Sequence, residues 1–235
     1  MLSVRDQIIS YAQMSVEFQT NALLQSVLEV VDTSKQNILW HLYRLVEQGL
    51  LLRVGRGAYT IEVKPQFFPH PNAKVVRIYQ LLKEQFPLLS LCVYSGEILA
   101  DLQHHLSYNN NIYIETDRDA TEIVFHFLQD CKERVFLSPD ADFVADYIHL
   151  DQASLIVKPL VSEAPTQEIE GVSSPRLEKL LVDILCDKDF FYLQGQEAAY
   201  ILEKATQSYG IKTDQLMRYA SRRNAKSKIE QLLAK

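Results

Sequence analysis

Residues 32–61 contain the most restrictive pattern in this chain, an amphipathic helix followed at once by a short hairpin. Ile38, Leu42 and Leu45 recur at helical spacing and predict the buried face of the helix. Residues 50–61 are mostly apolar or small and include two glycines, which is typical of two strands joined by a tight turn. This order predicts the third helix and the wing of a winged helix-turn-helix domain.

Both ends of this helix are expected to be capped. Thr33 is the predicted N-cap, because Gln36 lies three residues later and could complete a capping box. Gly49 follows the last periodic residue, where a left-handed C-cap favours glycine.

The opposite face of the helix carries amides, an arginine and aromatic residues. At 100° per residue this face contains Gln36, Asn37, Trp40, Tyr43, Arg44 and Glu47. Amides and arginine can hydrogen-bond base edges in the major groove of DNA. We therefore predict that Gln36, Asn37, Trp40 and Arg44 contact the groove.

Phosphate contacts are expected from the start of the helix and from the hairpin. The predicted contacts are Ser34, Lys35, Arg53 and Arg56. Two other interpretations remain open. The helix could simply have a solvated outer face, or it could contact another protein through Trp40 and Tyr43.

Helical patterns at residues 4–14 and 20–28 precede this element and complete a three-helix order. We therefore predict a winged helix-turn-helix domain over residues 1–64. Three prolines fall within the next stretch, and proline interrupts helices. Residues 65–74 are accordingly the expected linker, and residues 75–235 the second domain.

The second domain alternates between strand and helix patterns up to about residue 170, and is helical from residue 173 onward. Strands are expected near residues 89–93, 112–114, 134–137 and 154–159. Pro175 is expected in the first turn of a helix that ends at Leu185. The predicted fold class is α/β (α+β overall), with a small sheet and a helical C-terminal end.

Charge is distributed unevenly along the chain. The net charge is −6, but residues 65–170 hold seven Lys/Arg and sixteen Asp/Glu, and so form a poor surface for DNA. Residues 212–235 hold seven Lys/Arg and two Asp/Glu. The N-terminal domain and the C-terminal end are therefore the parts that could approach phosphates.

Composition indicates a globular protein of the cytoplasm. The chain is 47% hydrophobic and 23% charged, and no run of eighteen apolar residues could span a membrane. Residues 1–6 lack the apolar core of a signal peptide. Cys92, Cys131 and Cys186 are far apart in sequence, which argues against disulfides and a zinc site.

The sequence offers only weak signals for catalysis, and we expect neither a metal nor another cofactor. His104 and His105 would point to different sides of any regular element, which argues against a shared metal. Glu62-Val63-Lys64 has the E-x-K form of some nucleases but lacks an upstream strand aspartate.

Glu115 and Asp117 could place two carboxylates on one face of a strand end, as a two-metal site would require. The Ser95-Gly96 pair lies twenty residues earlier, vaguely as in a nucleotidyltransferase. An enzyme of nucleotidyltransferase or nuclease type is therefore the alternative hypothesis, although no third acid stands at a convincing spacing.

Two motifs resemble the AbiEi-type antitoxin family of type IV toxin–antitoxin systems. The wing sequence Arg56-Gly57-Ala58-Tyr59 resembles the R-G-x-Y signature of that family. Residues 174–185, SPRLEKLLVDIL, are similar to a P-x-x-E-K-x-L-V-D helix in its larger domain. Glu178, Lys179 and Asp183 are the charged residues of this motif helix. An acid in the first helical turn and a helix salt bridge would also explain them.

The resemblance implies a bacterial transcriptional repressor that binds repeats in double-stranded DNA at its own promoter. It also implies an antitoxin that counteracts a nucleotidyltransferase toxin without forming a stable complex. An enzymatic activity is not expected.

Overall fold

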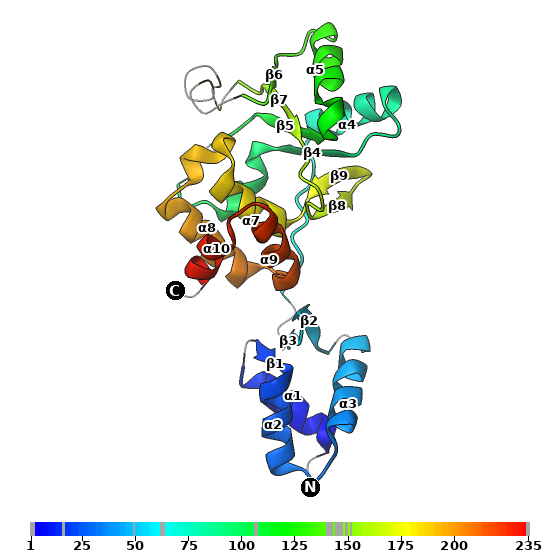
Figure 1. The fold of residues 1–235 in the computed structure, drawn as a ribbon, viewed down its shortest axis with the longest axis vertical. Helices are drawn as coiled ribbons and strands as arrows, with labels where there is room; N and C mark the ends of the chain where they lie inside the picture. Colours follow the sequence, from blue (N-terminus) through cyan, green and yellow to red (C-terminus); the bar gives the residue numbers. More distant parts are fainter. Residues whose placement is uncertain are drawn as a thin grey trace. The chain divides into compact units, whose positions relative to one another are not determined.

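The computed structural model describes residues 3–15, 17–48, 50–61, 64–105, 108–139, 143, 148, 150 and 152–233 (Figure 1). Its backbone packs into two compact units. The first comprises Met1–Gln66 with Ser208–Gln215, and the second comprises Phe67–Gln207 with Leu216–Lys235. Helices and several small sheets occur together and the C-terminal end is helical, which confirms the predicted fold class.

The first unit contains three helices and a small antiparallel sheet. The elements, in chain order, are α1 (Val4–Gln13), β1 (Phe18–Gln19), α2 (Thr20–Val30), α3 (Lys35–Glu47), β2 (Leu52–Gly55) and β3 (Ala58–Thr60). The strand order is β1-β3-β2. This is the topology of a winged helix-turn-helix, and β2 and β3 form its wing (Figure 1).

The core of the first unit lies between the three helices. Ile38, Leu42 and Leu45 are buried on α3, as their spacing predicts, and they pack with Ile8 of α1 and Leu23 of α2. Burial of each such side chain contributes about 1.5–3 kcal/mol. These contacts fix which face of α3 remains outside.

Helix α3 begins one residue later than expected. Its N-cap is Ser34, whose Oγ accepts the backbone N–H of Asn37 at 3.2 Å. The predicted capping box of Thr33 and Gln36 is therefore wrong. Thr33 instead accepts a hydrogen bond from the side-chain amide of Asn37 at 3.0 Å. Gly49, the expected C-cap, lies outside the described residues.

Ser34→Ala is expected to lower the free energy of unfolding of the first unit by about 1 kcal/mol, because a helix donor loses its acceptor. Urea unfolding followed by the fluorescence of Trp40, the only tryptophan, measures this. Thr33→Ala is the matched control and should change the same free energy by under about 0.5 kcal/mol. A larger loss from Thr33→Ala than from Ser34→Ala would restore the cap expected from the sequence.

The second unit is built on a four-stranded mixed sheet. The strands are β4 (Leu91–Ser95), β5 (Ile112–Thr116), β6 (Val135–Leu137) and β7 (Leu155–Pro159), in the order β4-β5-β7-β6. β4 runs antiparallel to β5, whereas β5, β7 and β6 are parallel. A separate hairpin consists of β8 (Thr166–Ile169) and β9 (Val172–Pro175).

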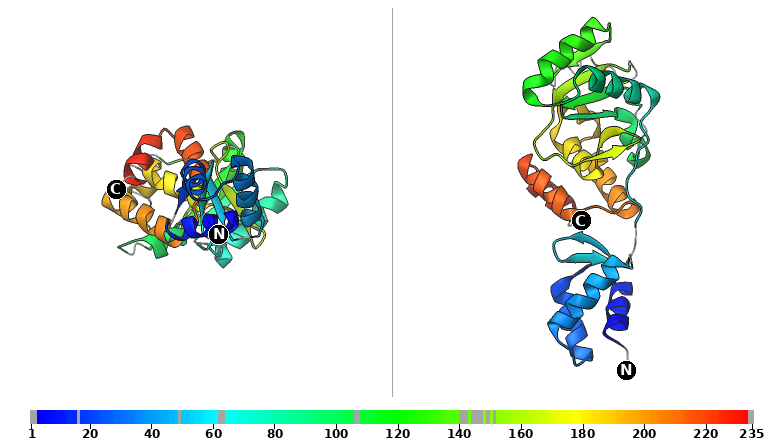
Figure 2. Two further views of the ribbon diagram at one scale, coloured as in Figure 1. Left: turned by 90° about the horizontal axis from the view of Figure 1, so that it is seen from below. Right: turned by 90° about the vertical axis from the view of Figure 1, so that its right-hand side faces the viewer.

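The helices of this unit are mostly short. They are α4 (Ala73–Gln85), η1 (Gly96–Leu102), η2 (Arg118–Ala120), α5 (Thr121–Asp130), α7 (Leu177–Cys186), η3 (Lys188–Leu193), α8 (Gln196–Ser208), α9 (Thr213–Arg222) and α10 (Lys226–Leu233). The views in Figure 2 show how these helices surround the sheet. Among the described residues, no helix has the length and apolar character needed to cross a membrane.

Alternation along the strands separates an apolar face of the sheet from a mixed one. Val93, Ile114 and Val157 pack with residues of α4 and α5 in one apolar core. Successive strand residues point to opposite faces, so Glu115 and Lys158 belong to the other face. They are paired across β5 and β7, and α7 supplies the residues that contact them.

Three expectations for the second unit need correction. Pro175 ends strand β9 rather than opening a helix, and α7 begins at Leu177. The linker is shorter than predicted, because α4 already begins at Ala73 and the second unit begins at Phe67. Residues 208–215 pack with the first unit, where the N–H of Gly210 donates to the carbonyl of Pro65 at 3.1 Å.

Candidate functional site

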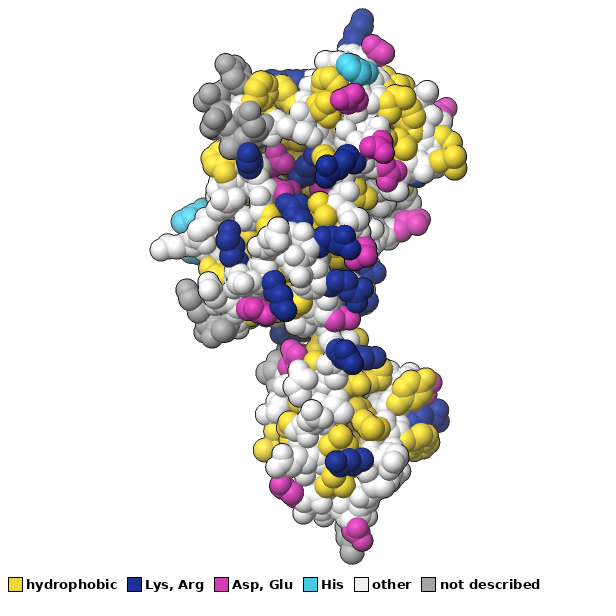
Figure 3. Space-filling model, viewed as in Figure 1, with side chains coloured by type: hydrophobic (Ala, Val, Ile, Leu, Met, Phe, Trp, Pro, Cys, Tyr) yellow, Lys and Arg dark blue, Asp and Glu magenta, His cyan; other side chains and the backbone are white. Residues whose placement is uncertain are grey.

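The outer face of α3 is open to solvent along its length. Its exposed side chains are Lys35, Gln36, Asn37, Leu39, Trp40, Tyr43, Arg44 and Glu47. Trp40 is 56% exposed and Tyr43 is 62% exposed, which is unusual for such large rings. In the view of Figure 3, hydrophobic side chains of this unit lie among only a few charged ones.

Arg44 is held on this face by two weak contacts. Its Nη1 lies 3.2 Å from Oε2 of Glu47, and its guanidinium carbon lies 5.7 Å from the centroid of the Trp40 ring. Exposed ion pairs contribute at most about 1 kcal/mol. Arg44 can therefore exchange Glu47 for a ligand at small cost.

The wing presents two further arginines. Gly57 has a φ of 74°, a left-handed conformation that favours glycine, and its carbonyl accepts both the N–H and the hydroxyl of Thr20, at 2.7 and 2.8 Å. The turn is thereby tied to the start of α2. Arg56 is exposed, whereas the Nε of Arg53 donates to the carbonyl of Gly55 at 3.2 Å.

The groove residues and the phosphate residues predicted from the sequence thus lie on one small unit. Lys35, Arg44, Arg53 and Arg56 are all exposed. Lys35 follows the Ser34 cap, and the positive end of a helix dipole favours an anion there. The arrangement suits a helix that enters a groove while its N-terminus contacts phosphate.

The alternative pair of acids occupies two different environments. Glu115 is only 2% exposed and faces Tyr94, whose hydroxyl donates to Oε1 at 2.9 Å. Asp117 lies beyond the end of β5, is exposed, and accepts the N–H of Ser90 at 3.0 Å. These separate contacts give no support to a joint two-metal site.

The other weak catalytic signals find no support either. A Cβ at Gly96 would lie 2.2 Å from the side chain of Asn109, so this glycine permits close packing of the chain. Glu62 of the E-x-K sequence lies outside the described residues.

The motif helix α7 carries a buried ion pair that the sequence suggested. Nζ of Lys179 lies 2.5 Å from Oδ2 of Asp183, one helical turn away, and 2.8 Å from Oε1 of Glu115. Lys179 is 1% exposed and Asp183 is fully buried. Asp183 also accepts the hydroxyl of Tyr219 at 2.8 Å. Glu178, the third motif residue, is buried beside them in sequence.

Four charged residues that the sequence analysis missed extend this pair into an ionic cluster. Nζ of Lys158 lies 2.7 Å from Asp187 and 3.0 Å from Asp189, and Arg223 forms a hydrogen bond with Asp187. The ionic cluster is defined as Glu115, Lys158, Lys179, Asp183, Asp187, Asp189 and Arg223. Its only local signal in the sequence was the Lys–Asp spacing in an otherwise apolar helix.

Burial and charge oppose each other within the ionic cluster. Burial raises the pKa of Asp183 to about 6, although Lys179 acts to lower it. Burial acts in the same direction on Asp187, but Lys158 and Arg223 outweigh it and hold its pKa at about 2. The pKa of Lys158 lies well above its usual value, because the carboxylates outweigh the effect of burial.

Acid is expected to weaken the second unit through Asp187. A pKa depressed in the folded state contributes stability that is present above the unfolded value of 3.8 and is lost as pH falls toward 2. Asp183, with its raised pKa, acts in the opposite direction between pH 6 and 4. The expected net loss between pH 4 and 2 is roughly 1–2 kcal/mol. Urea unfolding at several pH values measures it, and Asp187→Asn should flatten this acid limb; an unchanged limb would contradict the assignment.

Two cavities open beside these groups in the second unit. One of about 370 Å³ is lined by Glu115, Lys158, Asp187, Asp189 and Arg223 of the ionic cluster, among others. It adjoins the carboxyl ends of β5 and β7, where ligands bind in open α/β sheets. Its lining holds equal numbers of acidic and basic side chains, so it favours neither anions nor cations.

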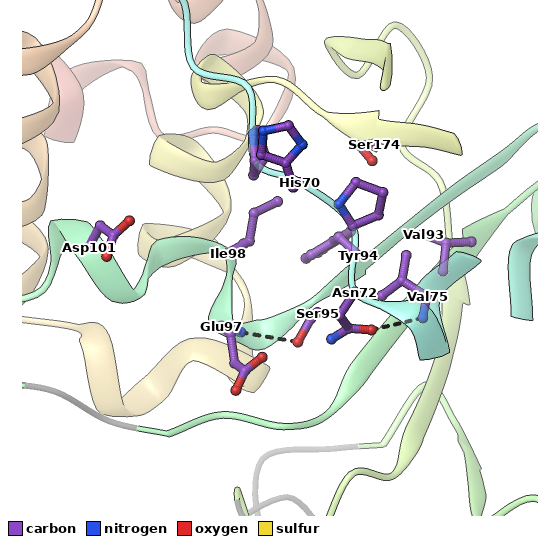
Figure 4. Close-up of a pocket in the computed structure, with 12 residues that line it drawn as sticks. His70, Asn72, Val75, Val93, Tyr94, Ser95, Glu97, Ile98, Asp101 and Ser174 are labelled. Carbon is purple, nitrogen blue, oxygen red and sulfur yellow. Dashed lines mark hydrogen bonds between the residues drawn. The ribbon is translucent and has the colours of Figure 1, made fainter. Parts of the chain in front are cut away.

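The other cavity, of about 200 Å³, lies between the start of α4 and η1 (Figure 4). Asn72 and Ser95 line it, but each already accepts a backbone N–H, from Val75 at 2.9 Å and from Glu97 at 3.3 Å. These two side chains therefore serve as helix caps.

Comparison with known families places the chain. The model of DUF6577, described as a family of unknown function, matches residues 37–235. The chain belongs to the DUF6577 family. No curated protein and no solved structure matches it significantly. The DUF6577 match begins within α3, so it covers most of that helix, the wing and the whole second unit.

Proposed function

We propose that this member of the DUF6577 family is a sequence-specific DNA-binding protein of the bacterial cytoplasm, and that it represses its own promoter. The observation that supports this most directly is the exposed outer face of α3, where Gln36, Asn37 and Arg44 stand beside the free wing residue Arg56. Amide and guanidinium groups on a helix of this width can hydrogen-bond base edges.

Antitoxin activity is the second part of the proposal and rests on the resemblance to the AbiEi-type family. The partner would be a nucleotidyltransferase toxin that the antitoxin counteracts without a stable complex. Of the motif residues, Lys179 and Asp183 are buried in the ionic cluster. Their contacts support a role in the architecture of the second unit rather than in contacting a toxin directly.

The test of DNA binding uses the full chain, because residues 208–215 pack with the first unit. Fluorescence anisotropy with the DNA upstream of the gene, and with a shuffled duplex of equal length, should show tighter binding to the upstream DNA. Affinity should fall as salt rises, because bound cations release counterions from DNA. Equal affinity for both duplexes would remove the claim of sequence specificity.

Antitoxin activity is tested by growth. Expression of the chain should restore growth to cells that produce the nucleotidyltransferase encoded beside it, and the two proteins should not co-purify. Failure to restore growth while operator binding persists would leave a DNA-binding repressor and reject the antitoxin.

One observation favours a different class of partner. Leu39, Trp40 and Tyr43 form an exposed apolar stripe on the same helix. A protein that docks there would make the winged helix an interaction module. In that case Trp40→Ala would abolish capture of the partner, and neither duplex would be bound.

A further inference from the structure

Two adjacent histidines and a distant glutamate converge at the surface of the second unit. Nδ1 of His104 lies 3.2 Å from Nε2 of His105. Together with a carboxylate oxygen of Glu197, these ligand atoms all lie within 4.8 Å of one another. The expectation that neighbouring histidines point apart is wrong here, because both follow the end of η1, where the chain is irregular and side chains do not alternate.

We propose that His104, His105 and Glu197 bind a divalent transition-metal ion of the zinc class. Imidazole nitrogen and carboxylate oxygen are both common zinc ligands. Two nitrogens that share one tetrahedral Zn²⁺, each at about 2.0–2.1 Å, are about 3.3 Å apart. The observed 3.2 Å between the two ring nitrogens matches that separation. Three protein ligands leave one position for water.

The surroundings hold these ligands in place. Oε1 of Glu197 accepts the backbone N–H of His104 at 2.6 Å and that of His105 at 3.4 Å, so the carboxylate is fixed beside both residues. Among the described residues, none donates to its other oxygen, which can face a metal. The ring of Tyr200 meets the His104 ring edge-on, with centroids 5.0 Å apart, and restricts its orientation. Outer contacts of this kind orient metal ligands.

A direct hydrogen bond between two neutral imidazoles would give the same nitrogen–nitrogen distance. The two possibilities differ in what happens when a metal is supplied. A hydrogen-bonded pair binds no metal tightly, whereas a metal site binds one ion per chain and depends on all three side chains.

Titration of the untagged full chain with Zn²⁺, in competition with a chromophoric chelator, tests the proposal. One equivalent should bind to the wild type. His104→Ala, His105→Ala and Glu197→Gln should each weaken binding at least about tenfold. The matched control is His126→Ala, which removes another exposed histidine, on α5, and should leave the affinity unchanged.

Two further measurements protect this result. Circular dichroism should show that each variant is folded, as expected for changes at the surface. The Co²⁺ complex should lack a thiolate-to-cobalt charge-transfer band, which excludes the exposed Cys131 as a ligand. The proposal is overturned if the wild type binds no Zn²⁺, if a charge-transfer band appears, or if His126→Ala weakens binding as much as His104→Ala.

Discussion

Lys179→Met is expected to destabilise the second unit by about 3–5 kcal/mol, because it leaves buried carboxylates without their cation. Lys179 lies 2.5 Å from Asp183 and 2.8 Å from Glu115, and all three side chains are almost completely buried. Methionine fills a similar volume, so the loss reports charge rather than a cavity. Urea unfolding followed by hydrogen exchange in β5 and α7 measures the free energy of this unit alone.

The chain offers a closely matched control on α10. Lys226 and Glu230 form the same i, i+4 pair, 3.8 Å apart, but their side chains are 54% and 51% exposed. Lys226→Met should therefore change the same free energy by no more than about 0.5 kcal/mol. A loss below about 1 kcal/mol for Lys179→Met would mean that the carboxylates are neutralised or hydrated without the lysine.

A compensating variant separates the charge from the fold. Lys179→Met combined with Asp183→Leu and Glu115→Gln removes both uncompensated carboxylates. Replacement of a whole buried ionic group by apolar or neutral side chains is often close to neutral in stability. The triple variant should therefore recover part of the loss, and a further loss would show that Tyr219 or Arg223 requires Asp183 as its partner.

Local periodicity was sufficient to predict the elements whose stability is local. Ile38, Leu42 and Leu45 are buried as predicted, because one helix face alone determines their spacing. Strand β1 was missed, since its two residues have no period of their own. It exists because Phe18 pairs with Tyr59 and Gln19 pairs with Ala58 of β3.

The β8–β9 hairpin was missed for a different reason. Its turn residues, Glu170 and Gly171, both have positive φ, at 53° and 77°, between the paired residues Ile169 and Val172. This is the backbone of a two-residue hairpin turn, which favours Asn-Gly or Asp-Gly. Glu-Gly gave a much weaker signal.

The ionic cluster shows why only part of a site can be predicted from sequence. The i, i+4 spacing of Lys179 and Asp183 predicted a helix salt bridge, and the bridge is present. Its third member, Glu115, lies on β5, and Lys158 reaches it only through the parallel register of β5 and β7. Strand register depends on tertiary packing, so a sequence pattern cannot supply it.

Arg56→Ala is expected to weaken binding to operator and random DNA about equally. Arg56 lies exposed at the tip of the wing, where Thr20 fixes the turn but no described residue orients the guanidinium. Such a side chain suits a phosphate, which is the same on every sequence. Its loss should also reduce the salt slope by about one counterion.

Arg44→Ala should instead cost roughly 1–3 kcal/mol on the operator alone and relax one base position. Its guanidinium lies against the Trp40 ring and Glu47 on a rigid helix, so it can offer two parallel N–H groups to a guanine. Anisotropy titrations of both variants on both duplexes, across salt, separate the roles. Arg77→Ala, which removes an exposed arginine of the second unit, is the control and should change neither affinity. If Arg44→Ala lowers both affinities by one factor, α3 does not recognise sequence, and its exposed face becomes a surface for a protein partner.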